Sequence, residues 1–204
     1  MNKISALILF LLFAPCAHAA VLQSYETGQD AGLEIGCGGG GCATRERAGA
    51  QSFQLDNDAT ITSVELYLQA NSGQDDINIR IETDSSSLPS GTLADANATC
   101  VISEANVPAS YDFEECTFST SFDLVASTTY WIHARRSSED SGGADENYGW
   151  GTDNSSPTYA NGEAKQSDND YSTGPNWSGT GRDALFRVNG DEAAAFTAKV
   201  MWFK

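Results

Sequence analysis

Two segments with alternating apolar and polar residues constrain the fold of this chain more than any other feature. In residues 64–69 (VELYLQ) and 77–82 (INIRIE) every second side chain is aliphatic. A period of two places one set of side chains on each face of a strand, so both segments are predicted to be half-buried strands. Residues 71–76 (NSGQDD) between them favour a turn. Two such strands are not stable alone, and we therefore expect a second sheet to cover their apolar faces.

Short strands are predicted along the rest of the chain, with turn signals roughly every ten residues. Glycine-rich residues 27–41 and the polar, aromatic-bearing residues 148–180 are predicted to be long loops. This pattern predicts an all-β fold, a two-sheet antiparallel β-sandwich of the jelly-roll kind, in a single domain over 20–204. The additional strands are expected at 21–26, 50–55, 99–103, 113–118, 121–125, 128–136, 183–188 and 196–202.

The first 19 residues have the composition of a secretory signal peptide. A short basic start at 1–3 is followed by an apolar segment at 4–13 and by the small-x-small sequence AHA at 17–19. We expect cleavage before Ala20 and a secreted protein, extracellular or periplasmic. The apolar segment is too short to span a bilayer, and no later segment is apolar enough, so membrane insertion is not expected.

The remaining cysteines are even in number, which favours disulfides in an exported chain. Four cysteines allow three pairings, and we favour the two local ones, Cys37–Cys42 and Cys100–Cys116. The four glycines of CGGGGC give the first loop the freedom to close. A zinc site is the alternative, although this spacing is wider than usual for zinc.

Acidic residues dominate the charge of the chain, which carries 28 Asp and Glu against 11 Lys and Arg, a net charge of −17. Such a polyanion is repelled by nucleic acid and by anionic membranes. The charge either solubilises an extracellular surface or includes carboxylates that bind calcium. The candidate calcium ligands are Asp56, Asp58, Asp75 and Asp76, which are equally suited to forming turns.

The aromatic residues of 148–180 form the first candidate ligand-binding site. Flat aromatic rings stack on the C–H faces of sugars while amides and carboxylates bind the hydroxyl groups. The alternative is that these rings close the open end of the sandwich. The predicted residues are Trp150, Tyr159 and Trp177 for stacking, with Asp153, Asn154 and Asn176 to orient the sugar.

A second candidate site lies on the predicted strand 128–136. Trp131, His133 and Arg135 share one of its faces because they are two residues apart. Such a face is either a binding surface or an ordinary solvent-facing side whose tryptophan is covered by a loop.

The sequence contains little that supports catalysis. His133 is the only histidine after the signal peptide, and no GxSxG nucleophile motif is present. We therefore predict a protein that is not an enzyme. A glycoside-active enzyme with two carboxylates is the alternative, because such chemistry needs only their separation and environment.

Several segments resemble exported bacterial β-sandwich domains of the choice-of-anchor group and jelly rolls similar to carbohydrate-binding modules. The resemblance covers about residues 48–190. It implies a jelly-roll sandwich outside the cell and leaves the ligand open. The segments that carry it are AQSFQL, ITSVELYL, INIRIETD, SLPSGTLAD, FDLVASTTYWIHARR, YGWGTDNSSPTYANGEA and DALFRVNG.

Together these features predict a non-catalytic protein that binds a polysaccharide or glycan at or outside the cell surface, with calcium as a candidate aid to binding. The alternative is a structural or adhesive subunit of a matrix, surface layer or filament, which self-associates.

Overall fold

The computed structural model describes residues 19–37, 46–71, 75–137, 147–168 and 176–193. These residues form an all-β structure whose helical content is one short 3₁₀ turn, Glu104–Asn106. The strands are β1 (Ala20–Tyr25), β2 (Ala31–Cys37), β3 (Glu46–Phe53), β4 (Ala59–Ala70), β5 (Ile77–Asp84), β6 (Pro89–Leu93), β7 (Thr99–Ile102), β8 (Asp112–Leu124), β9 (Tyr130–Arg136), β10 (Asn147–Asp153), β11 (Ala164–Asp168), β12 (Trp177–Gly179), β13 (Asp183–Ala184) and β14 (Phe186–Glu192).

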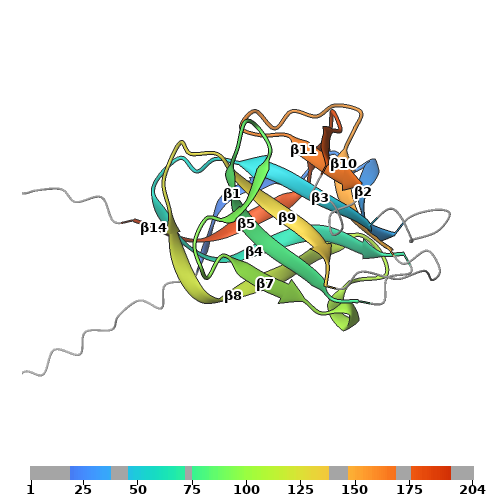
Figure 1. Ribbon diagram of the computed structural model, residues 1–204, viewed down its shortest axis with the longest axis horizontal. Coiled ribbons are helices and arrows are strands. Elements are labelled where there is room, and N and C mark those ends of the chain that lie inside the picture. The colour runs from blue at the N-terminus through green and yellow to red at the C-terminus, as the bar shows by residue number, and fades with distance from the viewer. Residues whose placement is uncertain (1–18, 38–45, 72–74, 138–146, 169–175, 194–204) are drawn as a thin grey trace, which may run out of the picture.

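Hydrogen bonds join the described strands into one antiparallel sheet in the order β1-β14-β4-β10-β2-β3-β9-β5-β6. Strand β8 pairs with β4, β7 pairs with β5, and the β11–β12 pair adds to β3. Figure 1 shows β3, β9 and β5 side by side along one side of the molecule. The all-β antiparallel prediction is confirmed, whereas the division into two sheets of a jelly roll stays a prediction.

The apolar core lies on the inner face of this curled sheet. The predicted alternation is confirmed in β5, where Ile77, Ile79 and Ile81 are fully buried. The same is true of β4, whose burial alternates along most of its length. Contact across the interior is direct, because the rings of Phe53 on β3 and Phe186 on β14 lie 6.1 Å apart between their centroids. The rings thus connect strands that are not neighbours in the sheet.

A disulfide connects β7 to β8, two strands that pair with β5 and β4, which are well separated in the strand order. Cys100 and Cys116 have Cα atoms 5.9 Å apart and are both buried. Because β7 pairs with β5 and β8 pairs with β4, the bond joins the two margins of the curled sheet. This predicted pairing is confirmed. The other predicted disulfide involves Cys42, which lies outside the described residues, as do most of the predicted signal peptide and the strand predicted at 196–202.

Both predicted long loops contain strands. Within residues 27–41, strand β2 places Leu33 and Ile35 in the core. Residues 148–180 include most of β10 together with β11 and β12. Both β2 and β10 contain two glycines, at 32 and 36 and at 149 and 151, and glycine lowers the strand propensity that sequence patterns measure. The loop predictions for these segments were therefore wrong in part.

Removing the Cys100–Cys116 bond tests its role at this margin. We expect the Cys100→Ala/Cys116→Ala double variant to lose about 3 kcal/mol of unfolding free energy, because the bond closes a loop with a sequence separation of 16 residues. Equilibrium denaturation in urea measures the change, with the exposed-site variant Ser119→Ala as the control. An unchanged free energy of unfolding would contradict the expectation.

Candidate functional site

The outer face of strands β3, β9 and β5 carries Trp131, His133 and Arg135, as the sequence predicted. On β5, the residues directly opposite these three are Glu82, Arg80 and Asn78. On β3, Ser52 and Ala50 lie opposite Trp131 and His133. The face therefore has large polar and aromatic groups on β9 and β5 and small side chains on β3. This difference in size creates space above β3.

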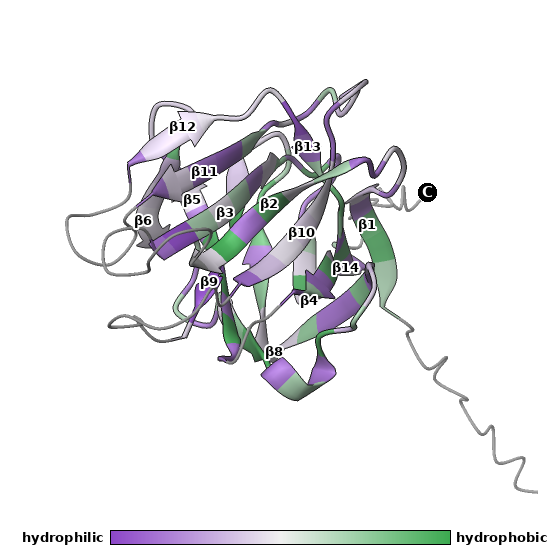
Figure 2. Ribbon diagram, turned by 90° about the vertical axis from the view of Figure 1, so that its right-hand side faces the viewer, coloured by the Kyte–Doolittle hydropathy of each residue, from purple (hydrophilic) through white to green (hydrophobic). Residues whose placement is uncertain are grey.

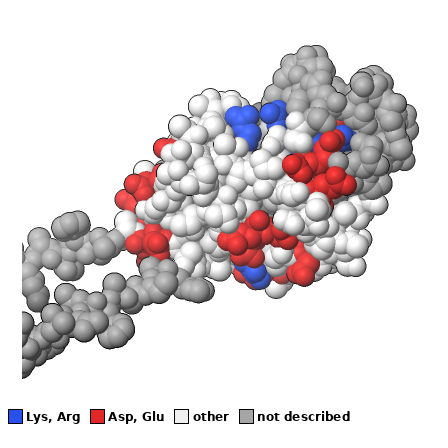
Figure 3. Space-filling view, turned by 90° about the horizontal axis from the view of Figure 1, so that it is seen from below, with Lys and Arg blue, Asp and Glu red and all other residues white. Residues whose placement is uncertain are grey.

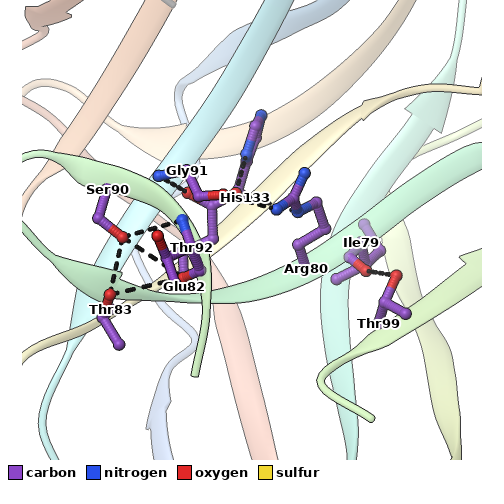
Figure 4. A network of polar contacts seen from close by, with 9 residues as sticks. All are labelled: Ile79, Arg80, Glu82, Thr83, Ser90, Gly91, Thr92, Thr99 and His133. Atoms are coloured by element: carbon purple, nitrogen blue, oxygen red, sulfur yellow. Dashed lines mark hydrogen bonds and ion pairs between the residues drawn. The ribbon is translucent and has the colours of Figure 1, made fainter. Parts of the chain in front are cut away.

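A buried ion-pair network fixes the middle of this face (Figure 4). The Glu82 carboxylate is 1% exposed and accepts a 2.9 Å hydrogen bond from Nδ1 of His133. Its other contacts are with Nε of Arg80 at 3.1 Å and the Gly91 backbone N–H at 2.8 Å. Burial acts to raise the pKa of Glu82, but His133, Arg80 and the Gly91 hydrogen bond outweigh it, so this pKa lies below its usual value.

Trp177 reaches this face from β12, which β11 and β3 separate from β9. Its indole ring meets the His133 ring edge-on, with centroids 5.0 Å apart and an interplanar angle of 83°. The ring reaches His133 across β3, where Ala48 and Ala50 provide only methyl groups. Trp177 is half-buried, and its indole N–H is shielded without an acceptor among the residues that the structure describes. A half-buried ring of this kind has surface available for a ligand.

A pocket of about 250 Å³ opens beside Trp131 at the end of the same face. The Asp84 carboxylate, which is exposed, accepts a 2.8 Å hydrogen bond from the indole N–H of Trp131. It also accepts the backbone N–H of Ser87 at 3.2 Å. The pocket wall contains carboxylates, hydroxyl groups, an amide and one aromatic ring. Its lining residues are Ser52, Asp84, Ser87, Thr129, Trp131, Asn161, Gly162 and Glu163.

The turn that holds Asp84 has an uncommon backbone. Ser86 and Ser87 both have positive φ angles, 57° and 63°. Residues other than glycine rarely adopt this left-handed conformation, which costs of order 1 kcal/mol each. Such conformations concentrate at functional turns, and here the turn forms one wall of the pocket.

The remaining predicted aromatic residues lie elsewhere. Trp150 is fully buried in the core and donates its indole N–H to the Leu185 carbonyl at 2.8 Å, so no face of its ring can stack on a ligand. Tyr159 packs on the ring of Phe186 and accepts a hydrogen bond from Gln23. Burial raises the pKa of Tyr159 to about 12. Both rings therefore contribute to the interior.

The predicted polar residues of 148–180 also separate. Asp153 is buried and accepts a 2.7 Å hydrogen bond from the hydroxyl of Tyr25. Asn154 is exposed, and its side-chain oxygen accepts a 3.0 Å hydrogen bond from Nε of Arg182. Asn176 is exposed and adjoins Trp177 in sequence. The structure therefore brings Trp177, but not Trp150 or Asp153, to the β9 face.

The four predicted calcium ligands have protein partners in most cases. Asp75 forms an ion pair with buried Arg136, and Asp76 accepts the Glu104 backbone N–H at 2.9 Å. Asp58 accepts the backbone N–H of Ala126 at 2.8 Å, while Asp56 is exposed. Within the described ranges no three acidic, cysteine or histidine side chains are grouped as a metal site.

Acidic side chains nevertheless gather in patches on the surface, as Figure 3 shows from below. On β8, Glu114 lies close enough to Glu115 and Asp112 for their charges, together with burial as the larger cause, to raise its pKa. These carboxylates give this side of the surface a negative potential.

Sequence reasoning missed Glu82, Arg80 and Asp84 as members of the site. The sequence indicated them only by position, because they occupy the polar places of the alternating segment that continues to residue 84. Recognising them requires the pairing of β5 with β9, which joins segments about fifty residues apart.

Comparison with known proteins adds no relative. No protein-family model matches the chain, and no curated protein matches it in sequence. The resemblance to choice-of-anchor and carbohydrate-binding domains therefore stays a prediction. Among the described residues, no helix has the length and apolar composition needed to cross a membrane.

The Glu82 network gives a pH-dependent prediction. The pKa of Glu82 is lowered in the folded protein, so its stabilising contribution is present above the usual carboxyl pKa of 4.5 and is lost as the pH falls through the lowered value. We expect Glu82→Gln to lose about 3 kcal/mol of unfolding free energy at pH 7 because it removes the carboxylate that pairs with the Arg80 guanidinium and with buried His133. Urea denaturation between pH 3 and 7 measures the difference, which should shrink towards pH 3. The exposed variant Glu115→Gln is the control, and a difference independent of pH would contradict the explanation.

Proposed function

We propose that this protein is an exported, non-catalytic domain that binds carbohydrate on the outer face of β3, β9 and β5. The observation that carries the proposal is the pocket beside Trp131, whose wall combines an oriented carboxylate with several hydroxyl groups. Export from the cell and the jelly-roll arrangement expected from the sequence belong to the same proposal.

The composition of the pocket wall suits a small polyhydroxylated ligand. Ser87 and Thr129 supply hydroxyl groups, Asn161 supplies an amide, and Asp84 and Glu163 supply carboxylates. These groups can accept and donate the hydrogen bonds of sugar hydroxyls. A volume of about 250 Å³ is below the range for drug-sized ligands and suits a group the size of one sugar ring.

Trp177 supports the binding of a further sugar ring next to the pocket. Trp131 and His133 are two residues apart on one strand face, a separation of about 7 Å. Trp177 contacts the His133 ring, so its half-buried ring lies on the same face as Trp131, beside the next outward-facing residue of β9. A chain of sugars can therefore place one ring in the pocket and stack the next on Trp177.

Hydrogen bonds beneath the face hold its polar side chains in fixed orientations. Asp84 is held by Trp131 and Ser87 and retains lone pairs for a ligand. His133, beneath Trp177, is held by Glu82. Groups fixed before binding lose less conformational entropy when the ligand arrives, which favours affinity.

Asp84 and Trp177 provide the test. We expect Asp84→Asn and Trp177→Ala each to weaken glycan binding about tenfold, because a hydrogen bond to a charged group and an aromatic stacking contact each contribute about 1.5 kcal/mol. The full chain would first be screened on a glycan array with calcium and again with a chelator. Calorimetry with the sugar class that binds then measures the affinities of the variants.

Matched controls separate binding from folding in this experiment. Asp95→Asn removes a carboxylate of another exposed turn, where it accepts the Asn97 N–H, and should leave affinity unchanged. Trp177→Phe keeps a ring and should retain most of the affinity. Unchanged affinity in both Asp84→Asn and Trp177→Ala would remove this face from the proposal. Absence of binding to every glycan, with a change of assembly state in chelator, would favour the structural-subunit alternative.

A further inference from the structure

A second part of the outer face, on β2 and β10, has a floor of bare backbone. Leu33 and Trp150 point into the core, so Gly32, Gly149 and Gly151 point outward on the opposite face. Gly32 pairs with Gly151 directly, and Gly149 lies two residues further along β10. Figure 2 shows β2 and β10 side by side, with β4 next to them. Glycine in a strand interior is unfavourable and often marks the close approach of another group.

The group that approaches this floor is an aromatic side chain. A Cβ atom added to Gly32 or to Gly149 would lie 2.5 Å from the hydroxyl oxygen of Tyr111. Tyr111 is also stacked with Tyr67 of β4, with centroids 5.6 Å apart and an interplanar angle of 15°. A Cβ at Gly151 would be 2.8 Å from Cδ1 of Tyr67. The glycines therefore allow two tyrosine rings to rest against the sheet.

A pocket of about 220 Å³ opens beside Tyr111 and contains polar groups at its edges. Glu34 contributes a carboxylate that is paired with Arg47 and keeps 24% of its side chain exposed. Asn71, which is exposed, donates its amide to the Asn147 side chain at 2.8 Å. The lining residues are Gly32, Leu33, Glu34, Asn71, Tyr111, Asn147, Tyr148 and Gly149.

We propose that this glycine-floored pocket is a second saccharide-binding site, in which a sugar ring contacts Tyr111 and is oriented by Glu34 and Asn71. The half-buried tyrosine provides an aromatic surface for the C–H face of a sugar, while the carboxylate and the amide bind its hydroxyl groups. The glycine floor holds the Tyr111 ring close to the sheet, beside the pocket into which the sugar would bind. The ligand class is shared with the proposed function, on which the inference rests.

The second site is separate from the first in both strands and residues. The pocket beside Trp131 is lined from β3, β5, β9, their adjoining turns and the segment before β11, whereas the pocket beside Tyr111 is lined from β2, β10 and the segments flanking β4 and β8. No residue lines both pockets. One chain could then hold a polysaccharide at two places, or hold two polysaccharide chains, and gain avidity from the pair.

The experiment uses the full chain with soluble glucans, mannans and xylans as probes. Titration followed by amide NMR is expected to shift the Gly32 and Gly149 signals together with those around Trp131. Tyr111→Ala is expected to weaken binding at the glycine floor about tenfold, whereas Tyr111→Phe keeps the ring and should stay within about twofold of the parent. Asn71→Ala, which changes an exposed residue, serves as a second variant in case Tyr111→Ala does not fold. It should weaken binding at the same site several-fold.

The outcomes separate this inference from the proposed function. Signals that shift only around Trp131, with Tyr111→Ala, Asn71→Ala and the parent binding alike, would overturn the second site and leave the first. Shifts confined to the glycine floor would support the second site and overturn the proposal for the first. No shift with any probe would overturn both.

Discussion

A continuous sheet with one apolar face must curl until that face is enclosed, and this constraint organises the molecule. Ile77, Ile79 and Ile81 of β5 point inward, and the rings of Phe53 and Phe186 meet across the interior. The margins meet where Cys100 joins Cys116. Since the inner face is filled by packed side chains, any ligand must bind on the outer face or its rims. Both candidate sites lie there.

The outer face is not uniform, because residue size varies from strand to strand. On β3 the alanines leave space that the Trp177 ring crosses, and on β10 the glycines leave space that Tyr111 fills. Small residues thus let aromatic groups from distant segments approach the sheet. The buried Glu82 carboxylate has the opposite role, since it holds His133 and Arg80 in fixed positions. Small residues on β3 and β10 therefore provide space on the outer face, while the buried carboxylate on β5 fixes the positions of its neighbours.

Much of the fold could be predicted from the sequence, and the reasons for the failures are local. Aliphatic alternation revealed β4 and β5, and a short separation of turn-capable residues indicated the Cys100–Cys116 bond. Strand β10 was missed because its outer positions are glycines, which leave Tyr148 and Trp150 looking like isolated rings in a loop. Trp150 then appeared to be a binding residue, although its neighbours in space make it part of the core. The β9 face was recognisable, but Glu82 and Asp84 join it only through strand pairing, which one segment cannot reveal.

The two left-handed serines beside Asp84 have a consequence for the kinetics of recognition. Ser86 and Ser87 hold their turn in a conformation that the rest of the fold imposes before any ligand is present. In the proposed site, a sugar would therefore meet a carboxylate already in place and would not wait for a loop to close. Encounter should then be governed by diffusion and charge, and ligands that differ in fit should differ chiefly in how long they stay bound.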